Sequence, residues 1–195
     1  MDSSALQTHV AAAKAGRAEG YQALLAAYNS RLYGYFYRMT GNRHDAEDLL
    51  GETVLRLVRT LPNYTEQGRF EPWLFRIAAN LVRDRFRRQK VAPTTVSLTT
   101  SADGDGPDLA AAVPGREPDV DAALLASEAA SDLKAALNTL DPTTRNMIML
   151  RHFAELSFAE IAEIMDCPLG TALAKVHRGL KTLRKKLAAS TAVGH

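Results

Sequence analysis

The sequence predicts an all-α fold class: two small helical domains joined by a flexible acidic linker. In two stretches of the 195-residue chain, apolar side chains recur every three or four residues, which places them on one face of a helix. Between these stretches, residues 91–126 are rich in Pro, Gly, Ser, Thr and Asp and lose this pattern. We therefore expect domains over residues 1–90 and 127–195, with residues 91–126 as the linker.

The first two predicted helices follow each other closely. One covers residues 21–40 and ends at Gly41, a residue suited to a helix C-terminus. The next begins after Asn42, a good N-terminal cap, and stops before Pro62. Its expected buried stripe consists of Ala46, Leu49, Leu50, Val54, Leu57, Val58 and Leu61.

A loop and a basic helix complete the first domain. Residues 62–71 contain Pro and Gly without any periodicity, which favours a loop. Pro72 fits the first turn of a third helix, which runs to about Lys90 with Trp73 on its inward face. The C-terminal half of this helix is strongly basic, with Arg83, Arg85, Arg87, Arg88 and Lys90.

The second domain is expected to contain four helices. Residues 127–140 form the first, and the pair Asp141 and Pro142 caps and opens the second. Ser157 and Glu160 form a capping box for a short third helix. A turn at residues 166–168 leads to the last helix, which covers about residues 169–187. A short capped helix, a tight turn and a second helix are typical of a helix-turn-helix.

The charges are distributed unevenly along the chain. Residues 1–90 contain 14 Lys and Arg against 9 Asp and Glu, residues 91–127 contain 1 against 6, and residues 128–195 contain 9 against 7. The single cysteine, Cys167, excludes an internal disulfide. The N-terminus lacks the apolar run of a signal peptide, and no segment approaches the ~20 apolar residues of a membrane span. We therefore expect a cytoplasmic protein without membrane insertion.

Two segments favour contact with nucleic acid. Between residues 171 and 187 there are six Lys and Arg and no acid, as expected of a helix that lies in a DNA groove. The alternative is a solvated helix whose lysines serve solubility. Near the third helix, Tyr64 and Trp73 accompany several arginines, a combination that can stack unpaired bases. The alternative places Trp73 in the core.

An acidic face on the second helix is the third feature. Asp45, Asp48 and Glu52 are spaced three and four residues apart, which favours a solvent-facing or partner-facing stripe over catalysis or metal binding. The five histidines lack metal-ligand spacing, and no nucleophile elbow or phosphate-binding glycine loop is present. We therefore expect no catalytic residue, metal or cofactor.

Several blocks of sequence, in order, resemble the sigma-70 family of RNA polymerase sigma factors, extracytoplasmic-function (ECF) subfamily. Residues 32–49 and 72–81 are similar to its region 2. Residues 140–145, 156–164, 168–171 and 177–180 are similar to its region 4. The resemblance implies an ECF sigma factor, not an enzyme, which binds core RNA polymerase and directs transcription initiation at specific promoters.

The resemblance also implies roles for the matched residues. The beta-prime clamp helices of the polymerase would be bound by Asp45, Glu47, Asp48, Leu49 and Glu52. The minus-ten element would be recognised and melted by Tyr64, Trp73, Arg76, Asn80, Arg83, Asp84, Arg87 and Arg88. The minus-thirty-five element would be bound by Thr171, Ala174, Lys175, His177, Arg178 and Lys181. An anti-sigma factor is the further partner that this resemblance implies.

Two other interpretations remain open. A stand-alone helix-turn-helix regulator would explain the second domain but would leave the acidic face and the aromatic loop without a role. A metal-dependent nuclease would use Asp45, Asp48 and Glu52 as ligands.

Overall fold

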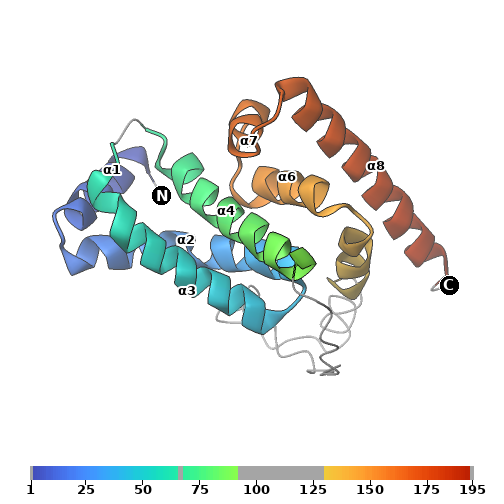
Figure 1. Cartoon of the computed structure of the whole chain (residues 1–195), viewed down its shortest axis with the longest axis horizontal. Helices are drawn as coiled ribbons and strands as arrows, with labels where there is room; N and C mark the ends of the chain where they lie inside the picture. The colour runs from blue at the N-terminus through green and yellow to red at the C-terminus, as the bar shows by residue number, and fades with distance from the viewer. Residues whose placement is uncertain (1, 66–67, 92–129, 194–195) are drawn as a thin grey trace.

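The computed structural model describes residues 2–65, 68–91 and 130–193, and all the regular structure in these ranges is helical (Figure 1). The first group of helices consists of α1 (Ser3–Lys14), α2 (Ala18–Thr40), α3 (Arg43–Thr60), the short 3-10 helix η1 (Leu61–Asn63) and α4 (Phe70–Val91). The second group consists of a helix described over residues 130–138, followed by α6 (Pro142–Phe153), α7 (Phe158–Ile164) and α8 (Leu169–Val193). The predicted all-α fold is confirmed for these residues. Apart from Val91, the predicted linker lies outside them.

The predicted helix boundaries depend on capping residues, and the structure confirms these caps. Gly41 ends α2 in the left-handed region, with φ of 69°, a conformation that glycine adopts without strain. The Asn42 side chain then accepts a hydrogen bond from the Asp45 amide at the start of α3. In the second group, Asp141 accepts from the Thr144 amide, and Ser157 with Glu160 forms the capping box of α7.

Helix α1 was not predicted, because its buried side chains are small and give a weak periodic signal. Val10 and Ala13 are buried against the first group of helices. At Gly20, near the start of α2, a Cβ atom would lie 2.3 Å from the Ala13 backbone nitrogen. The two helix backbones therefore approach closely only because residue 20 has no side chain.

This close approach makes Gly20 a sensitive position for stability. We expect Gly20→Ala to lower the free energy of unfolding by about 1–2 kcal/mol, since overpacking costs more than alanine's helix propensity returns. The matched control is Gly51→Ala in α3, where a Cβ meets no atom within 4 Å. We expect this control to raise stability by about 0.5–1 kcal/mol. Urea unfolding of both variants checks the pair, and equal effects would contradict the account.

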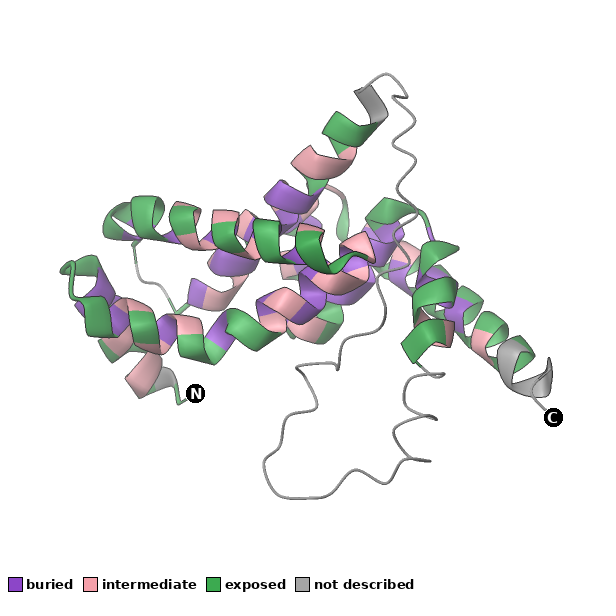
Figure 2. Ribbon diagram, turned by 90° about the horizontal axis from the view of Figure 1, so that it is seen from below, coloured by how far each residue is buried: buried purple, intermediate pink, exposed green. Residues whose placement is uncertain are grey.

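The two groups of helices pack directly on each other, mainly through α2 and α6. In Figure 2 the buried residues lie where helices face one another, and the exposed residues lie on the outward faces. The buried Tyr35 hydroxyl of α2 donates a 2.7 Å hydrogen bond to Oδ1 of Asn146 in α6. Burial raises the pKa of Tyr35, so its hydroxyl remains a neutral donor. The core is therefore continuous across both groups.

Candidate nucleic-acid interface

Helices α7 and α8 form the predicted helix-turn-helix. The turn spans residues 165–168, and Ala172, Val176 and Leu183 of α8 are buried. At 100° per residue, the buried side chains lie on one face of α8, most of the predicted minus-thirty-five set lies on the opposite face, and Thr171 and Lys175 lie at its edge. That set consists of Thr171, Ala174, Lys175, His177, Arg178 and Lys181. The fold thus presents a basic face outward from a helix held by its apolar side.

Most side chains of this face are available to a ligand. Ala174, His177, Arg178 and Lys181 are exposed, while Thr171 and Lys175 are half-buried. Arg178 Nε donates a 3.2 Å hydrogen bond to the Ala174 carbonyl, one turn earlier on the same helix. Such groups can meet phosphates and base edges when a helix enters the major groove.

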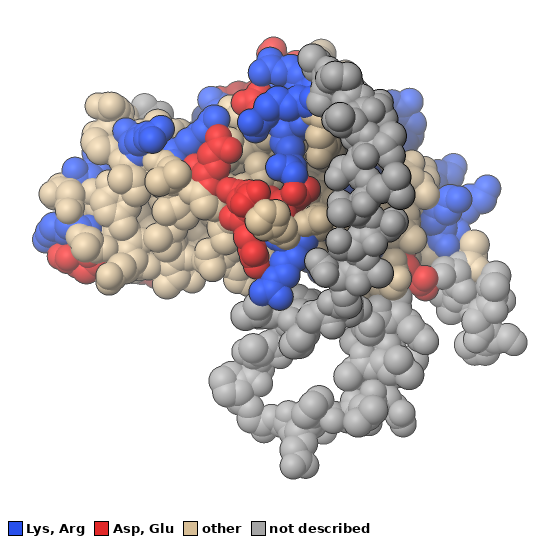
Figure 3. Space-filling view, turned by 60° about the horizontal axis from the view of Figure 1, so that its bottom comes forward, with Lys and Arg blue, Asp and Glu red and all other residues tan. Residues whose placement is uncertain are grey.

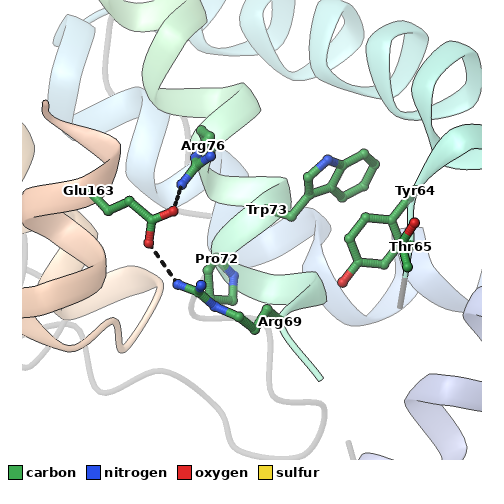
Figure 4. A pocket seen from close by; sticks show the side chains of 7 residues that line it. All are labelled: Tyr64, Thr65, Arg69, Pro72, Trp73, Arg76 and Glu163. Carbon is green, nitrogen blue, oxygen red and sulfur yellow. Dashed lines mark hydrogen bonds and ion pairs between the residues drawn. The ribbon is translucent and has the colours of Figure 1, made fainter. Parts of the chain in front are cut away.

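A second feature is an aromatic pocket of about 200 Å³ between the first group of helices and α7 (Figure 4). The rings of Tyr64 and Trp73 lie 4.6 Å apart at an interplanar angle of 34°. Phe70, which is buried in the core, contacts both rings. The remaining lining residues are Thr65, Arg69, Pro72, Arg76 and Glu163. Trp73 is only partly buried, so the structure combines the two interpretations of this residue as core and as surface.

The loop that carries Tyr64 is tied to α1. The Lys14 side chain donates a hydrogen bond to the Tyr64 carbonyl, between residues 50 positions apart in the chain. This contact gives α1 a place beside the aromatic pocket, which sequence reasoning did not predict. A loop carbonyl can accept a hydrogen bond from a lysine ammonium group, but no pattern in the sequence indicates which lysine reaches it.

The other predicted minus-ten residues follow along α4. Arg76, Arg83, Arg87 and Arg88 are exposed, and Asn80 and Asp84 are half-buried. Arg87 Nη2 lies 3.3 Å from Asp84 Oδ1, one turn earlier on the helix. Arg83 Nη2 donates a 3.0 Å hydrogen bond to the Ile164 carbonyl of α7. The aromatic pocket and the basic side chains therefore share one helix, but two of the arginines already contact the second group.

The acidic face of α3 differs in part from the prediction. Asp48 and Glu52 are well exposed, at 58% and 41% of their side-chain surface, and Glu47 is exposed at 50%. Asp45, in contrast, forms an ion pair with Arg85 of α4 and is 22% exposed. Figure 3, viewed from the side on which α3 lies, shows acidic side chains gathered between groups of Lys and Arg.

One apolar prediction on α3 is confirmed and another needs correction. Leu49 is 2% exposed and packs in the core, as expected of the predicted buried stripe, so its side chain supports the helix from inside. Val58, predicted to be buried, is 45% exposed, and Leu55 is 59% exposed. Thr53, which was not in the predicted stripe, is buried, and its hydroxyl donates to the Leu49 carbonyl and is thereby satisfied.

Four residues that line the pocket were absent from the predicted sites: Thr65, Arg69, Pro72 and Glu163. Arg69 lies at the pocket rim with Arg76, and its basic character in an aromatic loop is a signal that could have been used. Glu163 comes from α7 and reaches the same rim. No sequence pattern places Glu163 there, because the contact joins residues 94 positions apart.

Two features place this protein in the class of DNA-binding proteins. One is the helix-turn-helix with its basic face, and the other is the aromatic pocket beside arginines. Residues 24–91 match the family model for sigma-70 region 2, and residues 130–183 match the model for sigma-70 region 4. The chain is 30% identical over 174 residues to the ECF RNA polymerase sigma factor SigW of Bacillus subtilis, covering 89% of this chain and 92% of SigW. This protein therefore belongs to the ECF sigma factors of the sigma-70 family.

Other comparisons agree with this assignment. The chain is 36% identical over 165 residues to the ECF RNA polymerase sigma factor SigE of Mycolicibacterium smegmatis, covering 85% of this chain but only 60% of SigE. The fold is similar to CnrH in a complex with the cytosolic domain of CnrY, with a TM-score of 0.62, 21% identity and coverage of 93% and 96% of the two chains. It is also similar to the sigma factor RpoE bound to the anti-sigma factor NepR from Bartonella quintana, with a TM-score of 0.61, 21% identity and coverage of 86% and 96%.

Two further observations concern other kinds of site. In the described ranges, no helix is both long and apolar enough to cross a membrane. Over the same ranges, no three His, Cys, Asp or Glu side chains are grouped as metal ligands would be.

Proposed function

We propose that this protein binds core RNA polymerase and directs promoter-specific transcription initiation. In this proposal the first group of helices recognises and melts the minus-ten element, and α8 binds the minus-thirty-five element. The proposal rests on one observation. The family models for regions 2 and 4 match, in order, the first group of helices, with the aromatic pocket, and the second group, with the basic helix α8. The polymerase supplies the chemistry, so the protein itself is not an enzyme, and it acts in the cytoplasm where the polymerase is.

The minus-ten role is assigned to the aromatic pocket and the basic face of α4. A flipped base can stack on the partly exposed Trp73, while Arg69 and Arg76 meet the adjacent phosphates. Tyr64, predicted as a contact, is only 9% exposed and packs on Trp73, so it would support the stacking ring from the core. The other residues assigned to this element are Asn80, Arg83, Asp84, Arg87 and Arg88. Stacking is tolerant of sequence, so polar groups such as Asn80 would supply the preference for particular bases.

The polymerase-binding role is assigned to the exposed face of α3. Asp48, Glu52 and Leu55 follow at i, i+4 and i+7, so they share one face of the helix. Glu47 extends this acidic surface, which would dock on the beta-prime clamp helices. Asp45 and Leu49 would contribute by positioning α3, through the ion pair with Arg85 and through core packing.

An anti-sigma factor is the further partner that we propose. One solved structure with this fold is a sigma factor, RpoE, in a complex with the anti-sigma factor NepR. Such a partner would compete for the surfaces that bind DNA or the polymerase.

Run-off transcription with purified core polymerase tests the proposal. We expect the folded protein to raise initiation from its own cellular promoters, with start sites that core polymerase alone does not use. A native pull-down distinguishes the proposed function from that of a stand-alone regulator. Such a regulator would bind duplex DNA but would not co-purify with core polymerase. Failure in both assays would overturn the proposal.

Arg178 gives a test of duplex recognition by α8. If its guanidinium reads a base edge, Arg178→Ala should weaken binding to the minus-thirty-five duplex by about 1–3 kcal/mol and relax specificity at one position. If it meets only a phosphate, the slope of log K against log salt should fall by about one. Fluorescence anisotropy over a salt series distinguishes these results. Unchanged affinity and unchanged slope would remove Arg178 from the interface.

A further inference from the structure

The last turn of α1 is connected to the loop that carries the aromatic pocket. The Lys14 ammonium group donates a hydrogen bond to the main-chain carbonyl of Tyr64, and α1 also contacts η1, which ends one residue before Tyr64. The residues that match region 2 begin at position 24, so α1 precedes them. This contact therefore gives a helix outside the matched region a direct connection to the proposed minus-ten site.

The α1 end of this connection is rigid. Ala13, the residue before Lys14, is buried, and α2 approaches it so closely that a Cβ atom at Gly20 would lie 2.3 Å from the Ala13 nitrogen. Gly16 follows α1 in the left-handed region, with φ of 76°, and its amide donates a 2.9 Å hydrogen bond to the Ala13 carbonyl. The Lys14 side chain therefore extends from a turn whose backbone is fixed by packing and by its own hydrogen bonds.

The other end of the connection is the peptide group that joins Tyr64 to Thr65. Tyr64 has an extended backbone, with φ of −69° and ψ of 130°. Its amide donates a 3.0 Å hydrogen bond to the Leu61 carbonyl, and its own carbonyl accepts from Lys14, so both polar groups of its main chain are held. Because a carbonyl lies in the plane of the peptide group that follows it, the Lys14 contact sets the direction in which the chain continues to Thr65. Tyr64 and Thr65 both line the pocket.

The main chain held in this way carries the ring that supports the stacking surface. The Tyr64 ring is buried and lies 4.6 Å from the ring of Trp73, which is the partly exposed ring on which a base would stack (Figure 4). A side chain that binds a ligand needs neighbours that lock its rotamer. The placement of the Trp73 indole therefore depends on Tyr64, and the placement of Tyr64 depends on Lys14.

A direct contact between Lys14 and the DNA strand is the alternative role. An ammonium group has three donors, and the Tyr64 carbonyl takes one of them. However, Lys14 does not line the pocket, whereas Arg69 and Arg76 do. The geometry therefore favours a role that Lys14 exerts through Tyr64.

We propose that Lys14 is a positioning residue of the minus-ten site, which makes α1 a part of that site. This role rests on the proposed function of the aromatic pocket. By holding the Tyr64 carbonyl, Lys14 keeps the Tyr64 ring against Trp73. Loss of the ammonium group lowers the fraction of molecules in which Trp73 is placed for stacking, and the apparent affinity for a flipped base falls with that fraction. The effect appears in promoter melting and not in polymerase binding, which is assigned to α3.

Three variants of the full chain separate the hydrogen bond from the other properties of Lys14. Lys14→Met removes the donor but keeps a long unbranched side chain of similar helix propensity. Lys14→Arg keeps a charged donor and serves as the rescue. The control is Arg17→Met, which also removes one positive charge, from an exposed residue whose side chain forms no hydrogen bond or ion pair within the described ranges.

Trp73 is the only tryptophan of the chain, so its fluorescence reports the state of the pocket. Acrylamide quenching measures how accessible the indole is to solvent. We expect Lys14→Met to raise the Stern–Volmer constant and to shift the emission to longer wavelength. Lys14→Arg and Arg17→Met should keep the values of the unchanged protein. Equal quenching and emission in Lys14→Met and the unchanged protein would overturn the proposal.

The consequence for function is measured by permanganate reactivity of unpaired thymines in promoter complexes with core polymerase. We expect Lys14→Met to lower the open fraction about three- to tenfold, the range for the loss of one hydrogen bond. Lys14→Arg should restore most of the reactivity, and all three variants should bind core polymerase within twofold of the unchanged protein. Full melting by Lys14→Met, or an equal loss in Arg17→Met, would contradict a positioning role.

A double-mutant cycle with Tyr64→Ala distinguishes positioning from direct contact with the strand. Tyr64→Ala keeps the main-chain carbonyl but removes the ring, so the addition of Lys14→Met should lower the open fraction by less than about twofold further. A lysine that met a phosphate would retain its full effect in this background, and its loss would reduce the salt slope by about one. That result would assign Lys14 to the DNA-contacting surface and would remove its positioning role.

Failure of this proposal can be distinguished from failure of the proposed function. The quenching experiment requires neither DNA nor polymerase, so it reports the connection between Lys14 and the pocket alone. If the unchanged protein opens no promoter with core polymerase, the proposed function fails and the minus-ten role of Lys14 fails with it. If the unchanged protein opens promoters while Lys14→Met neither exposes Trp73 nor impairs melting, only the role of Lys14 is refuted.

Discussion

Asp48→Lys is expected to abolish binding of this protein to core RNA polymerase. Asp48 is 58% exposed on α3, and its carboxylate lies 3.9 Å from His44 Nε2 on the same helix, so the substitution should leave the fold intact. At an electrostatically complementary interface, juxtaposed like charges cost several kcal/mol. We therefore expect a loss of at least about 100-fold in affinity, measured by native pull-down or by anisotropy of a labelled protein.

The control for this charge reversal is Glu155→Lys on the second group of helices. It makes the same change in net charge on an exposed residue, and we expect polymerase binding to stay within twofold of the unchanged protein. Asp48→Lys should retain the duplex affinity of that control, since α8 lies in the other group. Equal loss of polymerase and duplex binding would contradict the division of roles between α3 and α8.

Trp73→Ala is expected to impair promoter melting while it preserves polymerase binding. Stacking of a base on an aromatic side chain contributes about 1–3 kcal/mol, so the fraction of open promoter should fall about ten- to a hundredfold. Permanganate reactivity of unpaired thymines in the minus-ten element measures this fraction. Trp73→Phe keeps a stacking surface and should restore most of the reactivity.

Stability must be monitored in this second experiment, because Trp73 also packs on Tyr64 and Phe70. Its partial burial implies a cost smaller than the 3–5 kcal/mol of a fully buried tryptophan. Retained polymerase binding shows that the first group of helices is folded. If Trp73→Ala melts promoters as well as the unchanged protein, the aromatic pocket is not the site that holds the strand.

The helices with strong local signals could be predicted from the sequence. Asn42, Asp141 and Ser157 cap their helices as expected, since a cap depends only on residues within the first turn. The weak signal of α1 shows the limit of this reasoning. Its buried face depends on alanines and on Gly20, and small side chains produce little periodicity.

The candidate site was likewise predictable from the sequence only in part. The basic face of α8 follows from 3.6-residue periodicity, because an apolar stripe on one side places the polar residues on the other. The acidic face of α3 was predicted only in part. Asp45 pairs with Arg85 across two helices, and a helical period alone does not show which carboxylate a neighbouring helix will cover.

The sequence by itself therefore determined the all-α class, the capped helices and the basic face of α8, because local hydrogen bonds and the helical period depend on nearby residues. The tertiary structure decided which groups meet across the chain. Glu163 reaches Arg69 and Arg76, and Tyr35 reaches Asn146, over separations of about 90 to 110 positions. Such contacts depend on how two helical groups pack, and packing is set by the shapes of whole surfaces, such as the space that Gly34 leaves for Phe153.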